Sequence, residues 1–147
     1  MNFFQKLKED KKNYQRSNTD EKKVIDAHYF SSYKNTLVVK KGGNSGAYLF
    51  VIWLGRKVKD ENLVKHEYGH KKQRENLGFF GYFKKVCIPS FLCFKLMVKK
   101  KLPYNYYSLP WEFEADSLGG VIRKNVKQIE NKGQFSVKNI LKLFKNR

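Results

Sequence analysis

Apolar and polar positions along the chain follow two different periods, and together they predict an α+β fold. Residues 36–40 (Thr-Leu-Val-Val-Lys) are β-branched and indicate a strand. Residues 47–54 (Ala-Tyr-Leu-Phe-Val-Ile-Trp-Leu) are apolar without alternation, which is typical of a strand covered on both faces. A glycine-rich segment, residues 41–46, separates the two runs. We therefore expect a hairpin that pairs Leu37–Lys40 with Ala47–Leu54.

Helical spacing begins after this pair of strands. Asp60 is a suitable N-cap for a helix that runs from about Glu61 to Glu75 or Asn76 and stops at Gly78. The aromatic and aliphatic stretch from Phe79 to Leu102 is interrupted by Pro89. It predicts either a second helix in two pieces, or a loop followed by a helix that starts near Pro89-Ser90.

Two further helices are predicted in the last third of the chain. Ser108 is a plausible N-cap for a helix beginning near Leu109-Pro110-Trp111, which Gly119-Gly120 interrupts and residues 121–130 can continue. Ser136 caps a last amphipathic helix, whose apolar side consists of Val137, Ile140, Leu141 and Phe144. Residues 1–23 are polar after Phe3 and Phe4 and read as a flexible or helical N-terminal extension. The length predicts one domain over residues 1–147.

Composition adds a strong charge to this outline. Hydrophobic content of 41% and aromatic content of 16% exclude a disordered chain, while the formal net charge of +18 predicts attraction to anionic partners. The excess is carried by 26 Lys and 5 Arg. Because arginine is the residue favoured for reading bases and gripping phosphates, this balance predicts no specific nucleic-acid recognition.

Localisation follows from what the chain lacks. The start of the chain shows no apolar leader, and the nearest candidate for a membrane span, Phe79 to Val98, contains Lys84, Lys85 and Lys95. The two cysteines, Cys87 and Cys93, are not in Cys-x-x-Cys spacing and are expected as reduced thiols. We expect a cytoplasmic protein that is at most peripheral to a membrane.

The strongest chemical signal is His66-Glu67-x-x-His70 within the predicted helix. Side chains at i and i+4 share one helix face, so both imidazoles point the same way and can hold one tetrahedral Zn²⁺. Glu67 borders that face, from which it can reach a water beside the metal. A catalytic zinc takes three protein ligands, so one more is needed.

The third ligand has several candidates. His28 is the remaining histidine, but Glu112 and Asp116 are a better source because they also share a face at i and i+4. One of these carboxylates can bind the metal while the other accepts a hydrogen bond from a ligand imidazole.

These residues resemble known metallopeptidases. Trp111-Glu112-Phe113-Glu114-Ala115-Asp116 resembles the segment that supplies the third zinc ligand in the HtpX/CAAX prenyl protease family, and the whole pattern resembles thermolysin-like gluzincins. His66-Glu67-Tyr68-Gly69-His70-x-x-Gln73 with Pro89-Ser90 also resembles small bacterial zincin-like proteins. The resemblance covers about residues 47–121. It implies a zincin-like fold with Glu112 as ligand, Asp116 as the partner of His66, and Glu114 as the rival ligand.

The expected function is a zinc-dependent, peptidase-like hydrolysis with Glu67 as general base and a peptide or protein as substrate. Candidate donors to the developing oxyanion are Tyr104, Tyr106, Tyr107, His28 and Arg123. Either predicted strand can be a sheet edge that binds an extended peptide. The rival hypothesis is a non-enzymatic basic module that associates with an anionic membrane surface or nucleic acid and in which zinc is structural or absent.

Overall fold

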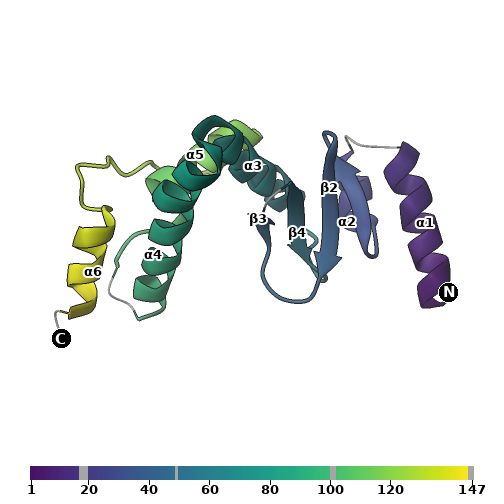
Figure 1. The fold of residues 1–147 in the computed structure, drawn as a ribbon, viewed down its shortest axis with the longest axis horizontal. Helices are drawn as coiled ribbons and strands as arrows, with labels where there is room; N and C mark the ends of the chain where they lie inside the picture. Colours follow the sequence, from purple (N-terminus) through teal and green to yellow (C-terminus); the bar gives the residue numbers. More distant parts are fainter. Residues whose placement is uncertain (17–19, 49, 100–101, 146–147) are drawn as a thin grey trace.

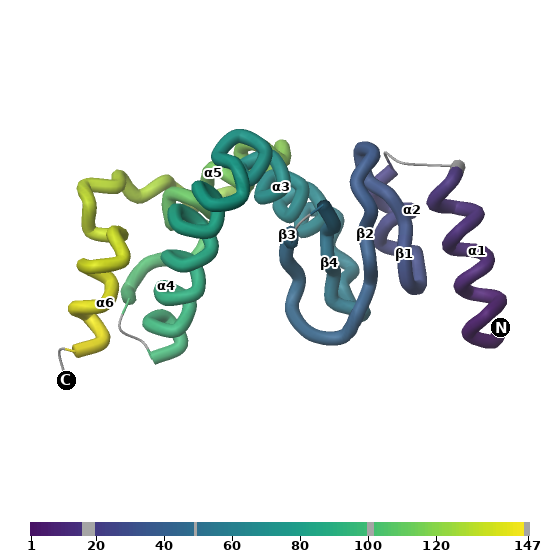
Figure 2. The backbone as a smooth tube through the Cα atoms, in the orientation of Figure 1, coloured from purple at the N-terminus to yellow at the C-terminus, as the bar shows by residue number. Residues whose placement is uncertain are grey.

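The computed structural model describes residues 1–16, 20–48, 50–99 and 102–145 and shows an α+β fold (Figure 1). The helices are α1 (Phe3–Arg16), α2 (Glu21–Asp26), α3 (Glu61–Tyr82), a π-helical turn (Phe83–Cys87), α4 (Ile88–Val98), a 3₁₀ turn (Tyr106–Ser108), α5 (Pro110–Gly119) and α6 (Val137–Lys145). The strands are β1 (Phe30–Tyr33), β2 (Thr36–Lys41), β3 (Gly46–Tyr48) and β4 (Val51–Gly55). The chain advances along the long axis of the molecule from α1 to α6, as the tube in Figure 2 shows.

The four strands form one sheet in the order β1-β2-β4-β3. β2 pairs with β4 in parallel, with Val38 opposite Ile52, and β3 pairs with β4 antiparallel, with Ala47 also opposite Ile52. The predicted hairpin of Leu37–Lys40 with Ala47–Leu54 is therefore wrong. The apolar run of residues 47–54 folds back on itself at the exposed Phe50 and supplies both β3 and β4. The antiparallel partner of β2 is β1.

Two clusters of buried side chains lie on either side of the α3–α5 pair. The first joins the sheet to α2 and α3 and consists of Val24, Tyr33, Val38, Ile52, Leu54, Val64 and Tyr68. The second joins the end of α3 to the π-helical turn, α4, α5 and α6 and consists of Tyr82, Val86, Cys93, Leu96, Leu109, Trp111, Phe135 and Ile140. Because α3 contributes to both clusters, the position of its side chains is fixed from two directions.

α3 begins as predicted, with Asp60 accepting a hydrogen bond from the Asn62 N–H at 2.9 Å. Gly78 has a positive φ of 69° and breaks the helical path, although helical structure resumes immediately and continues to Val98. Of the two arrangements predicted for residues 79–102, the structure shows the helix in two pieces, with the π-helical turn just before Pro89. Within the described residues, the helical run Glu61–Val98 is apolar enough in one 18-residue window to cross a membrane (mean hydropathy 1.3), and 22% of that window is buried. This weak candidate contains the stretch Phe79 to Val98 that the sequence also singles out, and no clear span is shown among the described residues.

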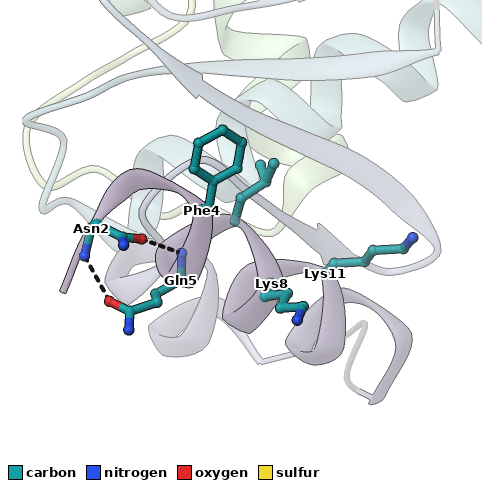
Figure 3. A pocket seen from close by; sticks show the side chains of 6 residues that line it. Asn2, Phe4, Gln5, Lys8 and Lys11 are labelled. Atoms are coloured by element: carbon teal, nitrogen blue, oxygen red, sulfur yellow. Dashed lines mark hydrogen bonds between the residues drawn. The ribbon is translucent and has the colours of Figure 1, made fainter.

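The N-terminal extension is helical and attached to the sheet. The backbone N–H of Asn2 donates to the Gln5 side chain and the N–H of Gln5 donates to the Asn2 side chain, which caps α1 (Figure 3). The buried Asp10 carboxylate accepts the backbone N–H groups of His28, Tyr29 and Phe30 at the start of β1. The surface hollow in Figure 3 lies on α1, remote from α5, and is lined by Asn2, Phe4, Gln5, Leu7, Lys8 and Lys11.

The helices after residue 108 agree only in part with prediction. Leu109, not Ser108, is the N-cap of α5, because Ser108 closes the preceding 3₁₀ turn. Gly120 adopts the left-handed conformation at the end of α5 and residues 121–130 are not helical, so the predicted continuation is wrong. α6 forms as predicted, and the Ser136 hydroxyl accepts the Asn139 N–H at 3.3 Å.

Candidate metal centre

Two glycines let α3 and α5 touch backbone to backbone. A Cβ atom built on Gly69 of α3 would lie 1.8 Å from the carbonyl oxygen of Ala115, and one on Gly119 of α5 would lie 2.0 Å from the carbonyl oxygen of Lys65. Neither position can carry a side chain while the helices keep this separation. The close contact places Glu112 of α5 opposite the His66–His70 face of α3.

Three potential ligand atoms converge at this contact. The distances are 3.1 Å between the Nε2 atoms of His66 and His70, and 3.2 Å from each of them to Oε2 of Glu112. Ligand atoms about 2.0–2.1 Å from a tetrahedral zinc lie about 3.3 Å from one another. The three atoms therefore already have the spacing that a tetrahedral metal site requires. Among the described residues they form the one cluster of at least three metal-ligating side chains.

His66 is oriented by α5 and the segment that follows it. Its Nδ1 lies 2.7 Å from Oδ1 of Asp116, and a carboxylate there accepts the Nδ1 proton. Asp116 is itself held by Arg123, whose Nε donates to Oδ2 at 2.7 Å. The guanidinium of Arg123 stacks 3.5 Å from the centroid of the Tyr107 ring, which contacts the ring of His66 edge-on.

His70 is oriented by Gln73 on the same helix. Its Nδ1 lies 2.8 Å from Oε1 of Gln73. The Gln73 amide nitrogen donates to two oxygens, the backbone carbonyl of Trp111 and Oε2 of Glu114, each at 2.7 Å. Those two acceptors fix which end of the amide faces His70, so the imidazole must donate from Nδ1. The lone pair of Nε2 then faces the ligand cluster.

Glu112 is oriented by two hydroxyl groups. Oε1 accepts hydrogen bonds from Ser90 of the α4 helix at 2.9 Å and from Tyr106 at 2.8 Å. These bonds occupy one carboxylate oxygen and leave Oε2 directed at the two histidines. The side chain is 1% exposed, so the carboxylate has no alternative stabilisation from bulk water.

The cluster has the geometry and charge to hold a cation. Both Nδ1 atoms donate outward, so three lone pairs meet at 3.1–3.2 Å, an arrangement that requires a proton or a metal ion between them. Protonation energetics agree with the geometry. Burial lowers the pKa of His66, but hydrogen bonds to Asp116 and Glu112 outweigh it and raise that pKa to about 9. The pKa of His70 is raised against its burial by Glu112, and the pKa of Glu112 is held below its usual range by both histidines despite burial.

Glu67 lies beside the cluster with one of its carboxylate oxygens unpartnered. It is 5% exposed, and its Oε2 has no hydrogen-bond partner among the described residues. Burial raises the pKa of its carboxyl group, and the two histidines only partly oppose that shift. A buried carboxyl group that is free to accept a proton suits a general base.

The other predicted residues fall into near and remote groups. Tyr106, Tyr107 and Arg123 border the cluster, whereas Tyr104 packs against Phe135 and His28 lies before β1, outside the cluster. The rival ligand Glu114 is exposed and binds Gln73, so it supports His70 indirectly.

Four participants were not identified as site residues from the sequence: Gly69, Gln73, Ser90 and Gly119. Tyr106 and Arg123 were predicted only as oxyanion donors, whereas here they hold Glu112 and Asp116. Gly69, Gln73 and Ser90 belong to the pattern that carries the resemblance to zincin-like proteins, and that pattern is the sequence signal that could have identified them.

The chain was also compared with known protein families, curated proteins and solved structures, and none of the three comparisons found a match.

Proposed function

We propose that the protein is a zinc-dependent hydrolase of peptide bonds with a zincin-like arrangement of its active site. The observation that carries this proposal is the convergence of Nε2 of His66, Nε2 of His70 and Oε2 of Glu112 at 3.1–3.2 Å, with the unpartnered Oε2 of Glu67 beside them. A set of two imidazoles and one carboxylate is typical of catalytic zinc, because it leaves the fourth position for water or substrate.

Each residue of the cluster has a separate task in this proposal. His66, His70 and Glu112 would hold the ion, and zinc would lower the pKa of a water molecule and polarise a carbonyl oxygen. Glu67 accepts the proton that the attacking water loses and passes it to the leaving amine. Asp116 and Gln73 keep both imidazoles in the tautomer that presents Nε2 to the ion.

The sheet offers a binding edge for an extended peptide. β2 and β4 are interior strands, and the edges are β1 and β3. Of the two strands predicted as a possible edge, Leu37–Lys40 is therefore interior, whereas Ala47–Leu54 supplies part of the edge strand β3. β3 packs against α3, and Phe50, just after it, lies under the guanidinium of Arg74 on that helix at 5.1 Å. We assign the peptide-binding edge to β3, because it is the edge nearest the metal-ligand helix.

Replacement of Glu67 by Gln tests this function. The substitution removes the base but no ligand, so the variant should bind zinc with wild-type stoichiometry and lose at least about 100-fold in hydrolysis of a peptide library. The matched control is Glu75→Gln, which changes an exposed glutamate on the same helix and should keep full activity. Full activity in the Glu67→Gln protein, or no zinc-dependent cleavage by the wild type, would contradict the proposal.

A further inference from the structure

The helical segment that follows Gly78 exposes an unusual number of large apolar side chains. Phe80 is 84% exposed, Phe83 52%, Phe91 57%, Phe94 51% and Val98 68%. Single exposed apolar residues are normal on any protein surface, but these five come from one helix. Phe80 and Phe83 are three residues apart before the π-helical turn, and Phe91, Phe94 and Val98 follow at steps of three and four in α4, so the members of each group share a helix face. We call this set the aromatic stripe.

The aromatic stripe faces away from the core. The opposite face of the same segment is buried in the second cluster of side chains described above. Its residues there are Tyr82, Val86, Cys93 and Leu96. The segment is therefore apolar on both faces, and only one face is covered by the rest of the described chain.

Lysines flank the aromatic stripe. Lys84, Lys95 and Lys99 each follow a stripe residue by one position and are exposed, and the Lys95 ammonium lies over the Phe91 ring at 4.5 Å. An apolar helix face bordered by lysines is typical of helices that lie in a membrane interface. The ammonium groups reach the lipid phosphates while the rings enter the acyl boundary.

The net charge of the protein and the length of the aromatic stripe favour a lipid bilayer as the partner of the stripe. With a net charge of +18, a second copy of this chain is repelled, whereas an anionic bilayer is attracted. The stripe is about 27 Å long at 1.5 Å per residue, nearly the thickness of a bilayer core. Lys84, Lys85 and Lys95 lie within that length, so a helix lying flat keeps their charges at the surface while a spanning helix would bury them.

We propose that the aromatic stripe rests in the headgroup region of an anionic lipid bilayer, with Lys84, Lys95 and Lys99 contacting lipid phosphates. Ser90, on the same helix, binds Glu112, so this contact would also hold the metal centre close to the membrane surface. The proposal stands whether or not the centre is catalytic, because none of its residues is a ligand.

Vesicle sedimentation of the full chain tests the proposal. The protein should bind vesicles of equal parts phosphatidylglycerol and phosphatidylcholine, bind pure phosphatidylcholine far more weakly, and be released in part by high salt. The variant Phe83→Ser, Phe91→Ser, Phe94→Ser should lose roughly 100-fold in partitioning, since each half-exposed ring contributes about fivefold when it is buried. The control Phe4→Ser, Phe50→Ser, Ile122→Ser changes three side chains of 75%, 80% and 92% exposure elsewhere and should lose less than about threefold.

Substitution of lysines tests the same proposal if the variant with three phenylalanines replaced by serine does not fold. Replacing Lys84, Lys95 and Lys99 by Gln should weaken anionic binding by roughly 100-fold, at about fivefold per lysine. Replacing the exposed Lys8, Lys11 and Lys12 of α1 removes the same charge and should weaken it far less. Equal losses in the two lysine variants, no binding to anionic vesicles, or lipid-free self-association that the stripe variant abolishes would each overturn the proposal.

Discussion

Replacement of Gly69 by Ala is expected to separate α3 from α5, the two helices that carry the proposed metal ligands. The added Cβ would lie 1.8 Å from the carbonyl oxygen of Ala115, where an ordinary contact is about 3.4 Å, so α5 must retreat by about 1.5 Å. Glu112 stands one turn before Ala115 and moves with it. An Oε2 atom that starts about 2.0 Å from a zinc ion would then lie about 3.5 Å away, outside any coordination distance.

Two measurements test whether α5 moves away from α3 in the Gly69→Ala protein. Zinc affinity of the Gly69→Ala protein, measured by competition with a chelator, should fall by roughly 100-fold or more, because one ligand is withdrawn. The free energy of unfolding in urea should fall by about 3 kcal/mol, the upper end for an overpacked site, since the obstacle is backbone and not a flexible side chain.

Gly42→Ala is the control for the loss of a glycine. No atom lies within 4 Å of a Cβ at that position, so zinc affinity should not change and stability should shift by less than about 1 kcal/mol. Wild-type zinc affinity together with wild-type stability in Gly69→Ala would refute the reasoning that this glycine sets the distance between α3 and α5.

Three further predictions follow from individual contacts. Asp116→Asn should weaken zinc binding by about 10–100-fold without abolishing it, because His66 loses its carboxylate partner but not its Nε2; unchanged affinity would contradict that role. Asp10→Ala should lower the free energy of unfolding by about 2–3 kcal/mol, because three partly buried backbone N–H groups lose their acceptor, and an unaltered urea midpoint would contradict it. Since the pKa of His66 is raised to about 9 and the pKa of His70 is also raised, zinc binding should release at least about one proton at pH 7 and fewer above pH 9. Calorimetry in buffers of different ionisation enthalpy measures this release, and a release that does not fall with rising pH would contradict the assignment.

The parts of the fold that depend on neighbouring residues could be predicted from the sequence. The α3 helix has a side-chain cap at Asp60 and a left-handed glycine at Gly78, both local signals. The juxtaposition of His66 and His70 follows from helix geometry alone. The α6 helix follows from its apolar spacing and Ser136.

The sequence-based predictions are wrong where residues far apart in the chain determine the structure. The run Ala47–Leu54 has no turn signal, so its division into β3 and β4 and the parallel pairing of β2 with β4 were not visible. The sequence shows a glycine at position 69 but does not show that it faces α5. It also does not show that the hydroxyl groups of Ser90 and Tyr106, from other segments, donate to Glu112. Such contacts depend on how helices pack, which local patterns do not encode.

The central claim is that His66, His70 and Glu112 hold one zinc ion. Equilibrium dialysis against zinc, followed by metal analysis, tests it most directly when the wild type is compared with Glu112→Gln and with its neighbour control Glu114→Gln. We predict about one zinc per chain for the wild type and for Glu114→Gln, and a loss of at least about 100-fold in affinity for Glu112→Gln. A folded wild-type protein that binds no zinc, or a Glu112→Gln protein that binds it as tightly as the wild type, would contradict the account.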